Sequence, residues 1–114
     1  MEDVAGSGIR IALGIDRHLF AFAGRHAELT WVDLVRDHPD RWKSVFLSHM
    51  SAPAVFVVFN LDGVNVWGGV ARAASGGKNV SMTDWELLQV RQNPRWWARI
   101  EWWRADRIVA NPFQ

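Results

Sequence analysis

The chain has 114 residues, with 13 basic and 12 acidic side chains, no cysteine and eight tryptophans. This length predicts a single domain with one hydrophobic core, and the lack of cysteine excludes disulfides, thiolate metal ligands and a thiol nucleophile. The apolar runs are too short to cross a bilayer, and Glu2 and Asp3 stand where a signal peptide carries basic residues. We therefore expect a cytoplasmic protein without membrane contact.

The first predicted elements are strands. Residues 1–8 are small and polar, and we expect a flexible lead into one domain over residues 9–114. Alternating apolar residues predict strands at 9–15 and 19–23. The second of these segments also suits a helix.

Two short helices are expected next. Thr30 precedes an amphipathic turn at 31–35, which makes it a candidate N-cap. Pro39 interrupts this helix, because a residue before proline avoids the α region. Asp40 can cap the second helix, whose apolar face ends at His49.

The middle of the chain predicts a β-hairpin. Residues 55–59 are β-branched or aromatic, which is typical of a buried strand, and residues 60–63 read as a tight turn. Residues 64–71 are expected as the partner strand, with Gly68-Gly69 at a bulge or a close backbone approach. Residues 74–78 follow as a flexible loop.

The last third is expected to contain one helical turn within 81–92, which Asn93 and Pro94 end. Residues 96–103 suit a helix or a strand, and we favour the strand because tryptophan has a high strand propensity and Pro94 prevents a helix from running in. The chain shows no βαβ rhythm. The predicted fold class is α+β, with a curved mixed sheet or a small barrel and short flanking helices.

Catalytic motifs are missing from the sequence. The glycine-rich segments lack the spacing of dinucleotide and phosphate loops, and no serine lies in a Gly-x-Ser-x-Gly motif. The four histidines are isolated from one another, unlike zinc ligands. We expect a protein that is not an enzyme, with no metal and no cofactor.

Tryptophan and arginine are the conspicuous residues. Eleven of the thirteen basic residues are arginine, which suits phosphates and aromatic faces. Tryptophan stacks on bases and encloses methylated or cationic groups. Three tryptophans in expected loops or at loop ends are candidates for such a cage: Trp31, Trp85 and Trp96. The alternative is that the tryptophans fill the core and the arginines lie on the solvent-exposed surface.

Two segments of the chain resemble parts of a known domain family. VFVVFNLDGVNVWGGVAR, residues 55–72, resembles the central hairpin of YTH domains, and ARIEW, residues 98–102, resembles a later strand of these domains. YTH and EVE domains belong to the PUA-like group, whose members bind nucleic acid, often at a modified base such as N6-methyladenine. The resemblance spans residues 9–109. It implies a PUA-like domain that binds single-stranded RNA or methylated DNA without catalysis.

The family's site can be placed on this sequence. The resemblance implies that Trp31, Trp85 and Trp96 form the base-binding cage, with Trp97 as a substitute for Trp96, and that Asp16 bonds the base edge. Basic residues in the second half of the chain are expected to hold the flanking phosphates: Arg72, Lys78, Arg91 and Arg95. The chain departs from the family after the first cage residue, where it has Val32 and the family has a small hydroxyl residue.

Two other functions fit the same residues. A small interaction protein of the inhibitor or immunity type uses exposed tryptophan and arginine as hot spots, and the net charge of +1 suits this class. A tryptophan-lined pocket for a small cationic compound is the other alternative. The partner of this domain can also be a protein or a larger effector chain.

Overall fold

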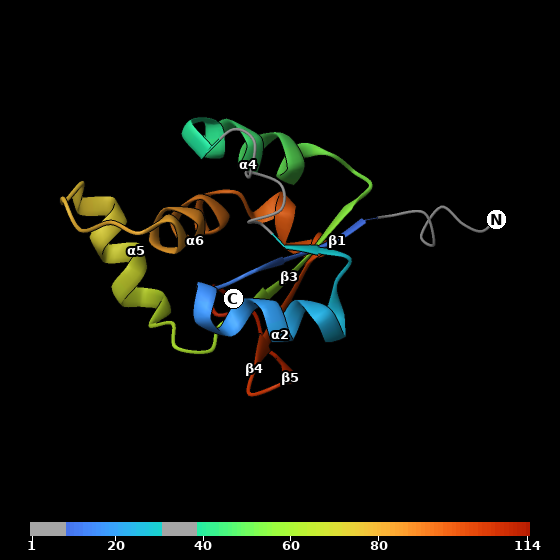
Figure 1. The fold of residues 1–114 in the computed structure, drawn as a ribbon. Helices are drawn as coiled ribbons and strands as arrows, with labels where there is room; N and C mark the ends of the chain where they lie inside the picture. The colour runs from blue at the N-terminus through green and yellow to red at the C-terminus, as the bar shows by residue number, and fades with distance from the viewer. Residues whose placement is uncertain (1–8, 31–38) are drawn as a thin grey trace.

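The computed structural model describes residues 9–30 and 39–114. Its elements in chain order are β1 (Ile9–Leu13), α2 (Asp16–His26), β2 (Leu29–Thr30), η1 (Pro39–Arg41), α4 (Trp42–Ser51), β3 (Val55–Asn60), α5 (Val66–Ser75), α6 (Met82–Gln92), η2 (Pro94–Arg99), β4 (Ile100–Arg104) and β5 (Arg107–Val109). The strands form one five-stranded sheet in the order β2-β1-β3-β4-β5 (Figure 1). The expected combination of a mixed sheet with several helices is confirmed.

The strand directions are mostly parallel. β1 pairs in parallel with β2 and with β3, and β3 pairs in parallel with β4. β5 runs antiparallel to its neighbour, β4. Each parallel pair needs a crossover connection, and α2, α4 and the α5–α6 pair lie in those connections. The expectation that the chain lacks a βαβ rhythm is therefore wrong.

Helices cover both faces of the sheet (Figure 1). α2 packs on one face, where Leu19 and Phe22 contact Ala12 and Val58. The helices α4, α5 and α6 cover the other face, where the larger core contains Ile11, Phe46, Val57, Phe59, Val70, Leu87 and Trp102. Successive side chains of a strand point to opposite faces, so β1 and β3 contribute to both cores.

Residues 19–23 form the middle of α2, so the helix alternative for this segment is confirmed and the strand is wrong. A strand would place Phe20 and Phe22 on the same face. In the structure Phe22 is 2% exposed and Phe20 is 56% exposed. Leu19, Phe22 and Ala23 are buried together at the i, i+3, i+4 spacing of a helix.

The second half of the predicted hairpin is also wrong. β3 is a strand as expected, but its sheet neighbours are β1 and β4, and the chain continues from residue 66 as the helix α5. Asn65 caps this helix, because its Oδ1 accepts a hydrogen bond from the Gly68 N–H at 3.0 Å. Gly69 supplies the close approach that was one of the expectations, since a Cβ there would lie 2.7 Å from Asp84 Oδ1 of α6.

Two capping predictions differ from the structure. Thr30 ends the strand β2 and is buried, and the helix predicted at 31–35 lies outside the described residues. The second helix exists as α4, but its N-cap is Arg41, which makes no side-chain capping hydrogen bond, and Asp40 lies in η1.

The last third agrees better with the prediction. The expected single turn is the full helix α6, which a Ser81–Asp84 capping box begins. The predicted strand starts later, because residues 94–99 form the 3-10 helix η2. Within β4 the expected alternation holds: Ile100 and Trp102 belong to the larger core, and Trp103 packs beside α2. Among the described residues, every helix is too short or too polar to span a membrane.

Candidate functional site

A pocket of about 380 Å³ opens beside the carboxyl ends of β1 and β3. This volume is within the range of small-ligand sites. Its wall comes from the β1–α2 loop, from the β3–α5 loop and from the first turn of α6, together with one residue each of the α2 and α5 bodies. The lining residues are Gly14, Ile15, Leu19, Gly63, Val64, Asn65, Arg72, Ser81, Met82, Thr83, Asp84 and Glu86.

The sheet topology explains why a pocket forms here. The chain adds β2 on one side of β1 and β3 on the other. The loops that follow β1 and β3 therefore leave toward opposite faces, one into α2 and the other into α5. Ligands of sheets with this kind of parallel order bind in the crevice between such diverging loops, at the carboxyl ends of the strands.

Three helices begin at the wall of this pocket. Ile15, Asn65 and Ser81 are the N-caps of α2, α5 and α6, and all three line it. Isoleucine has no hydrogen-bonding side chain, so the first N–H groups of α2 lack a side-chain cap. Aligned peptide dipoles give each helix N-terminus a partial positive charge. The pocket is therefore suited to an anionic group.

Two glycines let the loops at the pocket approach their neighbours closely. Gly14 lies against β3, where a Cβ would be 3.0 Å from the Asn60 carbonyl oxygen. Gly63 has φ of 75°, and a Cβ there would be 3.1 Å from His18 Nε2. A larger residue at Gly63 would be strained in the left-handed region and would press on α2.

An ion pair between Arg72 and Asp84 joins α5 to α6 in the pocket wall. The guanidinium donates to both carboxylate oxygens, at 2.9 and 3.0 Å. Asp84 also accepts from the Ser81 N–H at 3.2 Å. Burial raises the pKa of Asp84, but the hydrogen bonds from Arg72 and Ser81 outweigh it, so this pKa lies below its usual value. The carboxylate in turn raises the pKa of Arg72.

This ion pair predicts a pH dependence of stability. Because the folded-state pKa of Asp84 is lowered, its contribution is present above the unfolded-state pKa of about 3.9 and is lost as the pH falls through the folded-state value. Asp84→Asn removes the charge, and we expect it to lower the free energy of unfolding at pH 7 by about 1–3 kcal/mol. Urea unfolding of both proteins at pH 7 and near pH 2.5 measures the difference. The difference in the free energy of unfolding between the two proteins should be smaller near pH 2.5 than at pH 7. An equal difference at both pH values would contradict this account.

Glu86 adds a second carboxyl group to the pocket wall. It lies on α6 two residues after Asp84, and it is 2% exposed. The pocket therefore combines helix N-termini, which favour anions, with carboxyl groups, which accept hydrogen bonds from N–H donors. Neither Asp84 nor Glu86 is among the site residues predicted from the sequence. The Ser-x-x-Asp capping box at Ser81 was the signal that could have located the start of α6.

The two predicted cage tryptophans that the structure describes do not line the pocket. Trp85 is half-buried, and its ring packs edge-on against Trp42 at 5.0 Å and Phe46 at 5.5 Å. Trp96 is 5% exposed and packs edge-on against the same Phe46 at 6.1 Å. Among the described residues no ring contact joins Trp85 to Trp96, and both pack on the larger core. Trp31 lies outside the described residues.

Of the remaining predicted residues, Arg72 is the one that lines the pocket, and Arg95 lines a different cavity. Asp16 is the first residue of α2 and follows Ile15 of the pocket. Lys78 is exposed between α5 and α6. The Arg91 guanidinium lies over the Trp67 ring, 5.2 Å from its centroid. Arg95 lines a separate shallow cavity with Ser51, Trp96 and Arg99.

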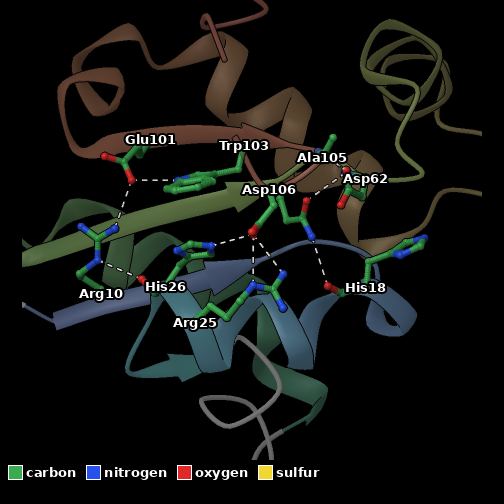
Figure 2. Close-up of polar contacts among 10 residues, drawn as sticks. Arg10, His18, Arg25, His26, Asp62, Glu101, Trp103, Ala105 and Asp106 are labelled. Atoms are coloured by element: carbon green, nitrogen blue, oxygen red, sulfur yellow. Dashed lines mark hydrogen bonds and ion pairs between the residues drawn. The ribbon is translucent and has the colours of Figure 1, made fainter. Parts of the chain in front are cut away.

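A second polar cluster connects the end of α2 with the β4–β5 turn (Figure 2). Asp106 accepts hydrogen bonds from His26 Nε2 at 2.8 Å and from Arg25 at 3.1 and 3.2 Å. The His26 hydrogen bond and then Arg25 lower the pKa of Asp106. Ala105 and Asp106 both have positive φ, at 53° and 60°, which turns the Asp106 carboxylate toward α2. These residues do not line the pocket. We therefore assign them a structural role, which is to hold the β4–β5 turn against the end of α2.

In the part of the chain that the structure describes, no group of three or more histidine, aspartate or glutamate side chains is placed to hold a metal ion. Comparison with models of known protein families, with curated proteins and with solved structures gave no match.

Proposed function

We propose that the chain is a binding protein for a nucleotide-like ligand, which carries a phosphate at one end and a ring with N–H donors at the other. The observation that supports this most is the composition of the pocket beside β1 and β3. Three helix N-termini line it together with the carboxyl groups of Asp84 and Glu86. A ligand with only an anionic group would meet those carboxyl groups unfavourably.

The phosphate end is proposed to bind at the start of α2. Backbone N–H groups of a helix N-terminus are a common phosphate site, and those of α2 have no side-chain cap. Arg72 also lines the pocket and balances the charge of Asp84 through their two hydrogen bonds. This pairing reduces the repulsion between an incoming phosphate and the Asp84 carboxylate.

The ring end is proposed to lie near Glu86. Carboxylates accept hydrogen bonds from the exocyclic amino groups of bases, and a base that leaves its stack is read through the same edge. Ile15, Leu19, Val64 and Met82 supply apolar wall for the faces of a ring. A base with an amino group therefore satisfies both the polar and the apolar parts of the wall.

This chemistry is shared by a free nucleotide and by a nucleotide within RNA or DNA. The modified-base reader predicted from the sequence is the second of these cases, and an N6-methyl group would meet the apolar wall. The tryptophan cage is not part of the proposal. The resemblance to YTH domains, a PUA-like barrel and a cytoplasmic location stay predictions, on which the proposal does not depend.

Calorimetric titration with adenosine 5′-monophosphate tests the proposal. We expect it to bind more tightly than adenosine or inorganic phosphate, because both ends of the ligand contribute. Inosine 5′-monophosphate, which has a carbonyl in place of the amino group, should bind more weakly because its carbonyl would face Asp84 and Glu86. The N6-methylated nucleotide and matched single-stranded oligonucleotides distinguish a free nucleotide from a modified base in nucleic acid.

A pocket-filling variant supplies the control. Thr83→Trp places an indole in the pocket wall and should weaken binding at least about tenfold. Gln92→Trp makes the same change at the exposed far end of α6 and should leave affinity unchanged. Equal affinity of both variants, or no preference for adenosine 5′-monophosphate over phosphate, would overturn the proposal.

A further inference from the structure

An aromatic slot lies around the ring of Phe113, and no residue of this slot lines the pocket. We define the Phe113 slot by the three tryptophans whose rings contact Phe113: Trp67, Trp97 and Trp102. The centroid distances are 5.5 Å to Trp67, 6.3 Å to Trp97 and 5.7 Å to Trp102. Trp97 stacks on the phenyl ring, and the other two meet it nearly at right angles. These are favourable geometries for aromatic pairs.

The body of the protein fixes two walls of the slot. Trp102 is 3% exposed and stacks on Phe59 at 5.2 Å. Trp97 donates its indole N–H to the Val90 carbonyl at 2.7 Å. Trp67 is the accessible wall, because it is 52% exposed and its ring also carries the Arg91 guanidinium. Two walls of the slot are therefore fixed by the body of the protein, and the third, Trp67, is exposed to solvent.

The segment that fills the slot is joined to the body by packing. Asn111 Oδ1 accepts from the Phe113 N–H at 2.8 Å, and the Asn111 carbonyl accepts from the Gln114 N–H at 3.3 Å. Within the described residues, no hydrogen bond connects 111–114 to the rest of the chain. The Asn-Pro-Phe sequence forms its own turn, since asparagine bonds the backbone two residues on and proline fixes φ.

We infer that the Phe113 slot is a peptide-binding site, and that residues 111–113 are the ligand it holds in cis. The partner that fits is a peptide of another protein that presents a phenylalanine from the same Asn-Pro-Phe turn. Such a turn is ordered by its own hydrogen bond, so it loses little conformational freedom on binding. Release of residues 111–113 from the slot breaks the three ring contacts of Phe113 and none of the hydrogen bonds described above.

The test uses the full chain with Phe113→Ala and a blocked peptide with the sequence of residues 109–114, VANPFQ. We expect saturable binding, followed by tryptophan fluorescence. The unaltered chain should bind the peptide at least about tenfold more weakly, because its own segment competes at an effective concentration in the millimolar range. A peptide with alanine in place of phenylalanine should not bind, and adding Trp67→Ala to the Phe113→Ala chain should weaken binding several-fold, up to about tenfold, because Trp97 and Trp102 remain.

The result that overturns the inference is a folded Phe113→Ala chain that gives no saturable response at millimolar peptide, or one that binds the alanine peptide equally well. Circular dichroism verifies the fold. If Phe113→Ala does not fold, Phe113→Leu keeps an apolar side chain in the slot and should bind the peptide more tightly than the unaltered chain does. Failure of that variant to do so also overturns the inference.

Discussion

Trp96→Ala should lower the free energy of unfolding by about 3–5 kcal/mol, which is the usual cost of removing a large aromatic side chain from a core. Trp96 is 5% exposed and packs on Phe46, which is itself 1% exposed. The removed indole leaves a cavity that Phe46 and the start of β4 fill only in part. Urea unfolding followed by circular dichroism measures the loss.

The matched control is Trp67→Ala, the same substitution at a tryptophan that is 52% exposed. It removes the contacts with Phe113 and Arg91, and we expect it to cost no more than about 1.5 kcal/mol. If Trp96→Ala instead leaves stability unchanged and abolishes binding of a modified base, Trp96 is a cage residue and its assignment to the core is wrong.

Two glycine substitutions should change stability in opposite directions. Gly69→Ala places a Cβ of α5 2.7 Å from Asp84 Oδ1 of α6. Asp84 is held by Arg72 and Ser81 and cannot move without losing those bonds. We expect the overpacking to lower the free energy of unfolding by about 1–3 kcal/mol, in spite of the better helix propensity of alanine.

Gly24→Ala is the control for Gly69→Ala, because Gly24 also lies in a helix but has no atom within 4 Å of an added Cβ. At Gly24 no steric contact opposes the higher helix propensity of alanine, so the free energy of unfolding should rise by about 0.5–1 kcal/mol. Thermal unfolding of both variants gives the comparison. A change of the same sign at both positions would contradict the close contact between Gly69 and Asp84.

The sequence predicted what depends on local residues. β3 follows from its β-branched and aromatic run, and the alternation within β4 follows from the period of a strand. The parallel partners of β3 could not be predicted, because β1 and β4 lie far from it in sequence. α5 was mistaken for a strand because Val64, Val66 and Val70 suit either structure, and the Asn65 cap was overlooked.

The candidate site was harder to predict than the fold. Tryptophan composition does not separate a buried ring from an accessible one, and Trp85 and Trp96 both pack on Phe46. The pocket brings together loops near residues 14, 63 and 81, which become neighbours through the sheet topology and the packing of α6 on α5. Arg72 is the predicted phosphate ligand that lines this pocket, where it also pairs with Asp84.

We propose that the pocket beside β1 and β3 binds both the phosphate and the ring of one ligand. The most direct measurement is the change in backbone amide NMR shifts as adenosine 5′-monophosphate is added. We expect saturable changes at Gly14, Ile15, Asn65 and Ser81, with the Phe113 slot unaffected. Changes confined to the surroundings of Trp85 and Trp96, or no changes at millimolar nucleotide, would contradict the claim.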